Sequence, residues 1–301
     1  MATVKLYQPL DMTALQAWDG TFPIVDAGHI QATDGVRTQD YFGSFQFSNG
    51  EVSGGVLTST VAYQNGAYYE VSGLNASAAT MAEYINNFDI KGAMAELLKG
   101  DDTLIGSAGN DVLKGGAGNN TYDGGAGIDT VYYDAGKQSV SIPSSGSTYV
   151  VDHPGGTDTL NNIERIDFGA GSVLALDVRV GENAGSAYRL YQAAFDRKPD
   201  DSGLKYWIKD LDNGANLQQI AQGFVDSAEF KALNPGADNS SIINNLYQHV
   251  LHRSADAEGA QYWENAMANG MSTHEVLVSF SESQENISNT AAALNNGLWL
   301  V

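Results

Sequence analysis

The hydrophobic and polar positions of the first part of the chain alternate with a period of two. Up to about residue 75 this alternation is clearest in residues 41–47 and in the segments on either side of Asn65-Gly66, and Asn49-Gly50 marks another break. Strands with one buried face have this period, and Asn-Gly is a strong signal for a tight hairpin turn. We therefore expect a β-rich antiparallel segment.

The pattern becomes helical in residues 76–98, where apolar residues recur three and four positions apart. Residues 86–89 carry Asn-Asn-Phe-Asp and interrupt the pattern. We expect two short helices here, packed on one side of the sheet.

A third period, of nine residues, occupies residues 97–132. Three places of each nonapeptide always hold the same type of residue: glycine at the fourth, Asp or Asn at the sixth and an apolar residue at the eighth. These are Gly100, Gly109, Gly118 and Gly127; Asp102, Asp111, Asn120 and Asp129; and Leu104, Leu113, Tyr122 and Val131. Such a unit is one turn plus one very short strand, which is stable only when units stack.

Each of these places has a physical reason. Glycine permits positive φ and close stacking of turns, whereas carboxylates with turn carbonyls form the all-oxygen ligand set that Ca²⁺ prefers. Consecutive turns would lie on opposite edges, so ligand partners are eighteen residues apart. This pairs Asp111 with Asp129 and Asp102 with Asn120. The second pair has one negative charge fewer and should bind calcium more weakly. A flexible Gly/Asn-rich linker is the alternative, but it needs no periodic apolar residues.

The nonapeptides resemble the repeat-in-toxin (RTX) family of secreted proteins. The resemblance implies a short calcium-binding parallel β-roll and type I secretion from a Gram-negative bacterium, directed by an uncleaved C-terminal signal. The apolar end, Leu298 to Val301, fits such a signal broadly but lacks the acidic residue that commonly precedes it. The N-terminal residues show no basic start and apolar run of a cleavable signal peptide.

Residues 131–168 are expected to extend and end the repeats. Residues 131–153 contain strand-like pieces separated by Ser/Gly turns, and residues 155–160 repeat the nonapeptide chemistry at lower fidelity. Residues 163–168 alternate with period two and predict a capping strand. Asp158 and Asp167 are candidate ligands for a further calcium site.

The last part of the chain is helical and duplicated at an offset of 56 residues. Asp200 and Asp256 precede helical runs and are expected to be N-caps. The paired Tyr206-Trp207 and Tyr262-Trp263 are expected to form two halves of a shared core. The pattern R-x-P-D-x-x-G-x-x-Y-W, complete from Arg197 to Trp207, resembles a helical domain of uncharacterised function found at the C-terminus of many RTX and surface-layer-associated proteins. The second copy lacks the proline.

These patterns predict an α+β multidomain chain. Its parts are an N-terminal antiparallel β-rich domain with helices (1–96), the β-roll with capping strands (97–180) and an all-α domain with internal duplication (181–301). The chain has 301 residues, 43% of them hydrophobic, a net charge of −21 and no cysteine. Nucleic acid and anionic membrane surfaces are poor partners for such a charge, and disulfides are excluded. No apolar run is long enough for a transmembrane helix.

Catalytic patterns are missing from the sequence, so we do not expect an enzyme. His249 and His252 could touch one metal from a helix face, but exposed polar residues explain them better. The aromatic residues at 41–69 are expected to pack in the core, with glycan stacking as the alternative. His29 with Tyr63, Tyr68 or Tyr69 raises a weaker alternative, haem capture.

Two functions remain from the sequence. The first is a secreted calcium-binding structural protein that assembles with itself into a surface layer, extracellular filament or biofilm matrix. The second is a monomeric secreted binding module, either a glycan adhesin for cell-surface polysaccharide or a haem carrier. Both leave the cell through the type I secretion machinery, and the only cofactor expected is Ca²⁺.

Overall fold

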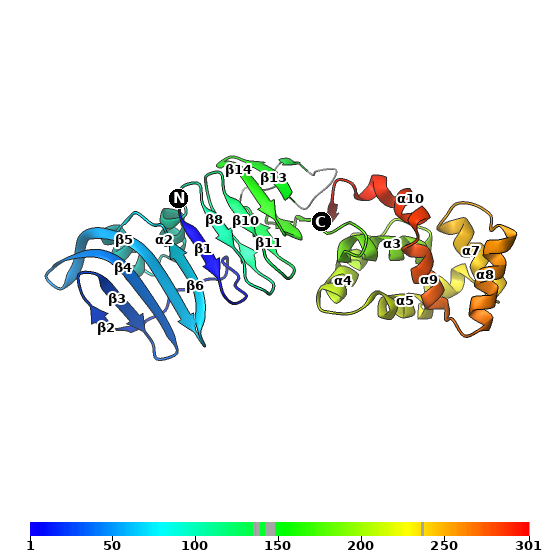
Figure 1. Ribbon diagram of the computed structural model, residues 1–301, viewed down its shortest axis with the longest axis horizontal. Coiled ribbons are helices and arrows are strands. Elements are labelled where there is room, and N and C mark those ends of the chain that lie inside the picture. The colour runs from blue at the N-terminus through cyan, green and yellow to red at the C-terminus, as the bar shows by residue number, and fades with distance from the viewer. Residues whose placement is uncertain (135, 137–138, 142–147, 236–237, 301) are drawn as a thin grey trace. The chain divides into compact units, whose positions relative to one another are not determined.

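The computed structural model describes residues 1–134, 136, 139–141, 148–235 and 238–300. The chain forms two compact units, Met1–Val173 and Leu174–Val301 (Figure 1). No helix among these residues has the length and apolar content needed to cross a bilayer.

The first unit begins with antiparallel strands. In spatial order they are β2 (Thr21–Val25), β3 (His29–Thr33), β4 (Arg37–Ser48), β5 (Glu51–Gln64), β6 (Ala67–Ser72) and β1 (Thr3–Leu6), with β7 (Ala76–Ser77) beside β5. The turns joining β4 to β5 and β5 to β6 place both of their residues at positive φ, 54° and 83° at Asn49-Gly50 and 55° and 113° at Asn65-Gly66. The expected β-rich antiparallel segment is confirmed.

Helices α1 (Ala78–Asn86) and α2 (Ile90–Leu97) follow and lie on one side of this sheet (Figure 1). Ser77 and Asp89 cap their N-termini by accepting backbone N–H groups. Phe88, at a φ of 54°, makes the break between the helices. The two short helices predicted for residues 76–98 are therefore confirmed.

The nonapeptides and the segment that follows them form short parallel strands in two sets. One set is β8 (Thr103–Ile105), β10 (Thr121–Asp123) and β14 (Gly156–Asn161), and the other is β9 (Val112–Leu113), β11 (Thr130–Tyr132) and β15 (Arg165–Asp167). The apolar residues at the eighth place are at most 1% exposed, so they form the thin core between the sets. Strands β12 (Ser139–Ser141) and β13 (Thr148–His153) continue antiparallel from β14. The Ser/Gly stretch expected to turn at 142–147 lies outside the described residues.

A link between β1 and β8 joins the two kinds of sheet. β1 is antiparallel to β6 on one side and parallel to β8 on the other, with Val4 opposite both Val71 and Leu104. The sheet is therefore mixed, and it runs without interruption from the N-terminal hairpins into the repeats.

The second unit is mainly helical. Its helices are α3 (Asn183–Phe195), α4 (Asp201–Asp212), α5 (Leu217–Asp226), α6 (Ala228–Leu233), α7 (Asn239–His249), α8 (Ala257–Ala268), α9 (Thr273–Ser281) and α10 (Gln284–Leu294), with the short strands β16 (Val173–Ala175) and β17 (Leu298–Leu300) at its two ends. Each helix from α3 to α6 starts 56 residues before its counterpart from α7 to α10 (for α3 and α7, 239 − 183). Asp200 and Asp256 cap α4 and α8, as predicted.

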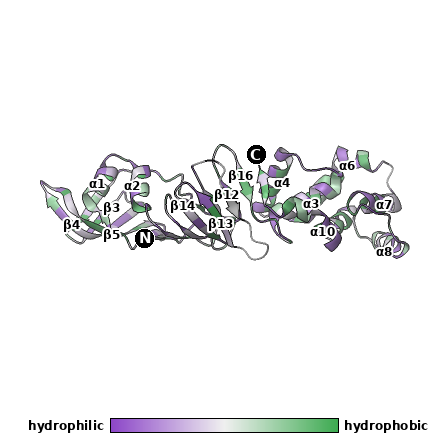
Figure 2. Cartoon of the chain, turned by 90° about the horizontal axis from the view of Figure 1, so that it is seen from above, coloured by the Kyte–Doolittle hydropathy of each residue, from purple (hydrophilic) through white to green (hydrophobic). Residues whose placement is uncertain are grey.

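The core of this unit corrects one expectation. Helix α3 is almost entirely buried, and much of it is coloured as hydrophobic in Figure 2. Tyr206 and Tyr262, however, are 58% and 61% exposed, so the prediction that the Tyr-Trp pairs share a core is wrong for the tyrosines. Only the tryptophans pack inward, each on a phenylalanine of its own copy: Trp207 on Phe224 (4.9 Å between ring centroids) and Trp263 on Phe280 (5.2 Å).

Candidate metal centre

Glycine at the fourth place lets successive turns stack eighteen residues apart. A Cβ atom on Gly118 would lie 2.1 Å from the carbonyl oxygen of Gly100, and one on Gly127 would lie 2.7 Å from the carbonyl carbon of Gly109. Both glycines also have positive φ, 111° and 127°. Any other residue would push the turns apart, because a Cβ cannot approach a backbone atom so closely. The stack therefore brings turn carbonyls and the sixth-place side chains of neighbouring turns together.

One column of sixth-place side chains runs beside β8, β10 and β14. The carboxylate of Asp102 accepts the N–H of Ala2, and Oδ1 of Asn120 accepts the N–H of Asp102 at 3.0 Å. Oδ1 of Asp158 then accepts the N–H of Asn120 at 2.7 Å. Each side chain thus caps the backbone of the turn before it.

A second column has the same form beside β9, β11 and β15. Oδ1 of Asp111 accepts the N–H of Leu10 at 2.7 Å, and Oδ1 of Asp129 accepts the N–H of Asp111 at 2.9 Å. The N–H of Asp129 donates to Oε2 of Glu164 at 2.8 Å. The pairs expected from the sequence, Asp111 with Asp129 and Asp102 with Asn120, are neighbours in these two columns.

Burial makes these charges costly. Asp102, Asp111, Asp129 and Asp158 are at most 3% exposed, and Oδ2 of Asp102 and of Asp129 has no hydrogen-bond partner in the described part of the chain. Burial, and then the negative charges of Glu164, Asp111 and Asp123, raise the pKa of Asp129 to about 7. A buried carboxylate oxygen without a donor is rare in a folded protein and needs a cation or a proton.

Of the four buried acidic positions, two have the oxygen ligands that suit a hard cation best. Asp102 and Asp129 each direct an unpartnered oxygen into the stack, next to turns rich in carbonyl oxygens, which are the ligands that Ca²⁺ prefers. Asp111 already receives the N–H and the hydroxyl of Ser107 on Oδ2, at 2.6 and 2.9 Å. No cluster of three His, Cys, Asp or Glu side chains forms among the residues described.

Asp158 and Asn120 are held differently. Oδ2 of Asp158 accepts the hydroxyl of Tyr133 at 2.8 Å, and Nε2 of the buried His153 lies 3.3 Å from its Oδ1. Asn120 leaves its amide nitrogen buried without a partner among the described residues. Two side chains of the protein thus lie against the carboxylate of Asp158, whereas Asn120 presents a donor where the other turns present an acceptor.

Asp167 does not join either column. Its Oδ1 accepts the N–H of Gly169 at 2.8 Å, and Glu164 takes the place next to Asp129 instead. The sequence pattern missed Glu164 because it lies 35 residues after Asp129, outside the multiples of nine.

The sequence also gave no sign that residues 2–12 close the start of both columns. Besides the bonds from Ala2 and Leu10, the N–H of Met12 donates to the carbonyl of Val112 and the N–H of Val112 to that of Leu10, both at 2.9 Å. A Cβ on Gly109 would lie 2.6 Å from Cγ of Pro9. The first residues of the chain therefore occupy the position of the turn that would precede the first nonapeptide.

The residues considered for other ligands lie apart. His29, on β3, stacks on Phe42 at 4.6 Å and its Nε2 lies 2.8 Å from Oδ1 of Asp40. Tyr68 and Tyr69 are on β6, and two strands, β4 and β5, separate β6 from β3. Nε2 of His249 lies 4.0 Å from the carboxylate of Asp196 rather than in a metal cluster. A haem site made of His29 and these tyrosines has no support in this arrangement.

Comparison with protein families agrees with the geometry. Residues 99–131 match the family model of the RTX calcium-binding nonapeptide repeat, in four copies. Residues 182–234 and 235–290 each match a domain of unknown function, DUF4214. A search of curated proteins gives no match. The chain thus carries an RTX calcium-binding repeat followed by two DUF4214 domains, as both resemblances predicted.

Proposed function

We propose that this is a calcium-folded structural protein of the extracellular space, in which the nonapeptides form a calcium-loaded parallel β-roll. The RTX repeat points to a calcium-binding, secreted protein. The observation that carries the proposal is the pair of buried carboxylate oxygens, on Asp102 and Asp129, without hydrogen-bond partners among the described residues. The turn carbonyls complete the proposed ligand set, and Asp111, Asn120 and Asp158, whose side-chain oxygens already accept protein donors, are weaker candidates. Asp167 lies apart from it.

Calcium supplies positive charge between the turns when bound, and the chain's own residues explain why that charge matters. Without it, Oδ2 of the buried Asp129 has no partner among the described residues, and the negative charges of Glu164 and Asp111 help burial to raise the pKa of this carboxyl group. Extracellular calcium modules bind at roughly 10⁻⁴–10⁻³ M, far above the concentration in the cytosol. At about ten times Kd each site stabilises the folded state by roughly 1.4 kcal/mol. The repeats would remain unfolded during export and fold outside the cell.

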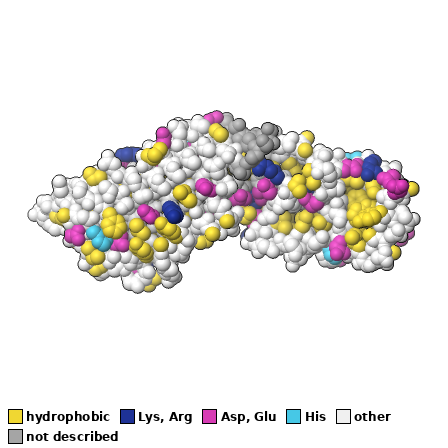
Figure 3. Space-filling view, viewed as in Figure 1, with side chains coloured by type: hydrophobic (Ala, Val, Ile, Leu, Met, Phe, Trp, Pro, Cys, Tyr) yellow, Lys and Arg dark blue, Asp and Glu magenta, His cyan; other side chains and the backbone are white. Residues whose placement is uncertain are grey.

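The structural role is supported by the position of the repeats within the first unit. Through β1 and residues 2–12 they connect with the N-terminal sheet, so calcium would stabilise both. The face in Figure 3 carries scattered rather than clustered Lys and Arg side chains, in keeping with the net charge of −21. We propose that cations screen this charge and allow copies to assemble into a surface layer, filament or matrix. We assign the protein no catalytic activity.

The calcium part of the proposal is tested by titration. Far-UV circular dichroism and calorimetry should give a calcium midpoint that Asp129→Ala and Asp111→Ala each raise by several-fold. Asp167→Ala, which alters a carboxylate outside both columns, is the matched control and should leave the midpoint in place. Equal midpoints for Asp129→Ala and the wild type would refute the site.

The assembly part is tested separately. Size-exclusion chromatography and electron microscopy with and without Ca²⁺ should reveal larger species only when calcium is present. A calcium-loaded protein that remains monomeric at high concentration would refute assembly and favour the second candidate, a monomeric binding module. That candidate is supported by a cavity in the N-terminal sheet.

A further inference from the structure

The N-terminal sheet leaves a cavity where its strands extend beyond the helices that cover them. β4 and β5 have 12 and 14 residues and are therefore about 40–45 Å long, whereas α1 has 9 residues and is only about 14 Å long. A cavity of 380 Å³ lies between the ends of these strands, β2 and one side of α1. It is within the size range of sites for small molecules.

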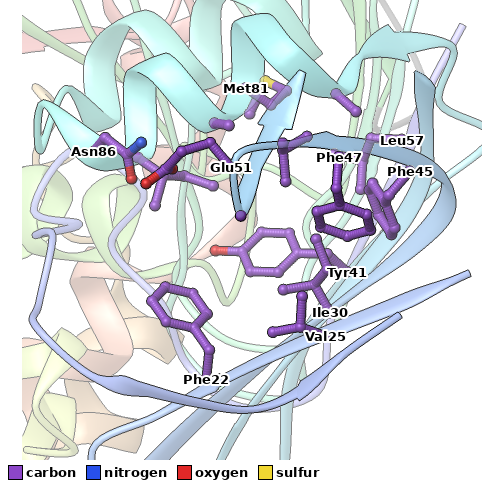
Figure 4. Close-up of a pocket in the computed structure, with 15 residues that line it drawn as sticks. Phe22, Val25, Ile30, Tyr41, Phe45, Phe47, Glu51, Leu57, Met81 and Asn86 are labelled. Atoms are coloured by element: carbon purple, nitrogen blue, oxygen red, sulfur yellow. The ribbon is translucent and has the colours of Figure 1, made fainter. Parts of the chain in front are cut away.

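The walls of the cavity are mainly apolar. Its lining includes Ile30 and Leu57 from the sheet, Met81 and Ile85 from α1, and the rings of Phe22 and Phe45. Figure 4 shows these side chains around the ring of Tyr41, which crosses the middle of the cavity. Phe22 is 52% exposed, far more than a core aromatic residue, although it faces this space.

Three polar groups face the cavity with unused hydrogen-bonding capacity. The half-buried Tyr41 and the exposed Glu51 and Asn86 line it, and within the described residues none of their polar side-chain groups makes a hydrogen bond or an ion pair, so Glu51 and Asn86 lie at the solvent-facing side of the cavity. In Figure 4 the Glu51 and Asn86 side chains lie at the same side of the cavity. Burial raises the pKa of Tyr41, so its hydroxyl stays protonated at physiological pH.

The charge of the lining restricts the ligand. Glu51 is its one charged residue, and no Lys or Arg is among the residues that line the cavity. A ligand with a carboxylate or phosphate head would meet repulsion and find no cation, whereas a hydroxyl, amide or ammonium head can donate to Glu51 and to Tyr41. Polar groups that a bound ligand leaves unpaired oppose binding, so the head group should decide affinity.

We propose that this cavity binds a small amphipathic molecule with an apolar body and a hydrogen-bond-donating head that carries no negative charge. Its apolar body lies against Ile30, Leu57 and Met81, and its head donates to Glu51 and exchanges a hydrogen bond with Tyr41. This binding function is additional to the calcium-dependent fold and does not depend on assembly.

The test compares ligands that share one chain and differ in the head. Calorimetry and ligand-observed saturation-transfer NMR on the calcium-loaded full chain would use 1-octanol and octanoate. We expect octanol to bind and octanoate to bind at least several-fold more weakly. Glu51→Gln should raise the affinity for octanoate and change that for octanol little. Equal binding of both by the wild type would overturn the proposal.

Two further variants locate the ligand. Tyr41→Phe keeps the ring and removes the hydroxyl, so it should weaken octanol binding roughly three- to tenfold. Ala82→Leu places a good helix former on α1 and fills the cavity, so it should abolish binding. Tyr63→Phe, on the same sheet but outside the cavity, is the control. Octanol binding that is unchanged in Ala82→Leu would place the ligand elsewhere and overturn the proposal. A circular-dichroism spectrum equal to that of the wild type shows that each variant is folded.

Discussion

The backbone N–H of Asp111 donates to Oδ1 of Asp129 at 2.9 Å, eighteen residues along the chain, while Oδ2 of Asp129 has no partner among the described residues. One oxygen of this carboxylate therefore holds two turns together, and the other is buried without a donor. The same side chain stabilises the fold with one oxygen and requires a positive charge near the other. The stability of the folded repeats therefore depends on what neutralises Asp129.

The first prediction concerns pH in the absence of calcium. Burial and neighbouring charges raise the pKa of Asp129 to about 7 from its usual 3.8, so the folded state retains a proton that the unfolded state releases. The contribution of Asp129 to the free energy of unfolding should be greatest below about pH 4. It should fall by about 2–4 kcal/mol as the pH rises to about 7. Thermal unfolding in chelator at several pH values measures this. Saturating calcium should remove much of the fall.

The control for this prediction is Asp129→Asn, which keeps the size and an acceptor oxygen but cannot ionise. Other carboxyl groups also titrate, so the difference between the two proteins is the relevant quantity. In chelator at neutral pH the variant should be the more stable protein, and its stability should depend less on pH. Parallel curves for the two proteins would show that Asp129 ionises normally.

The second prediction is that Asn120→Asp destabilises the protein in chelator and stabilises it in calcium. Asn120 is 1% exposed and its amide nitrogen lacks a partner among the described residues, so an aspartate would place a second unpaired oxygen there. In chelator the added buried charge should lower the unfolding temperature. In calcium it should raise that temperature and lower the calcium midpoint several-fold, because ligand charge sets affinity in such sites.

The matched control adds the same charge one residue away. Asn119 is exposed at the fifth place, where its Oδ1 accepts the N–H of Thr157 at 2.9 Å. Asn119→Asp keeps that acceptor but loses the amide that donates to Oδ1 of Asp101 at 3.3 Å, so it should lower stability slightly and by the same amount with and without calcium. If both variants respond alike, the effect is one of net charge and not of the site.

The third prediction is that the N-terminal strand sets the calcium requirement. Val4 is 2% exposed and lies between β6 and β8, so Val4→Ala should cost roughly 1–3 kcal/mol of lost burial. Because β1 pairs directly with the first repeat strand, the calcium midpoint should rise as well. Circular-dichroism titration measures both quantities. Val25→Ala, at a residue 52% exposed on the edge strand β2, should change neither. A destabilised variant with an unchanged midpoint would mean that the strand and the repeats fold independently.

The sequence predicted the parts of this molecule whose local signals agree with their environment. The hairpins follow from Asn-Gly turns, the two short helices from spacing and caps, and the duplicated helices from a constant offset of 56 residues. The neighbouring pairs Asp102–Asn120 and Asp111–Asp129 follow from the phase of nine. Periodicity predicted these elements because the residues that form each of them recur at a fixed spacing along the chain.

The remaining features depend on contacts far apart in sequence. Nothing in residues 2–12 resembles a nonapeptide, yet Ala2 and Leu10 bond the first two acidic side chains about one hundred residues away. Glu164 lies outside the repeat phase and still reaches Asp129. Tyr206 and Tyr262 recur with the duplication, but recurrence alone does not separate a core residue from an exposed one. The cavity at Tyr41 results from unequal lengths of strands and helices, which no single segment reveals.

The last prediction uses the duplication as an internal comparison. Tyr191 and Tyr247 are equivalent, both 5% exposed, with Arg197 and Arg253 each 4.9 Å above their rings. The Tyr191 hydroxyl donates to Asp200 at 2.7 Å and accepts from Arg197, whereas the Tyr247 hydroxyl makes no hydrogen bond within the described residues. Tyr191→Phe should therefore lower the free energy of unfolding by about 1–2 kcal/mol, and Tyr247→Phe by much less.

Urea unfolding followed by tryptophan fluorescence measures both variants, since Trp207 and Trp263 lie in the two copies. Asp200→Asn keeps an N-cap residue but weakens the bond to Tyr191, so the double variant Tyr191→Phe, Asp200→Asn should be less destabilised than the two single effects added together. Tyr191 packs on Phe195 and Phe224, and Tyr247 on Phe280. Because Tyr→Phe keeps the ring at both positions, each variant removes only the hydroxyl. Equal losses at Tyr191 and Tyr247 would show that the bonds of the Tyr191 hydroxyl to Asp200 and Arg197 add nothing to stability, and the two DUF4214 copies would then be energetically alike despite their different hydrogen bonds.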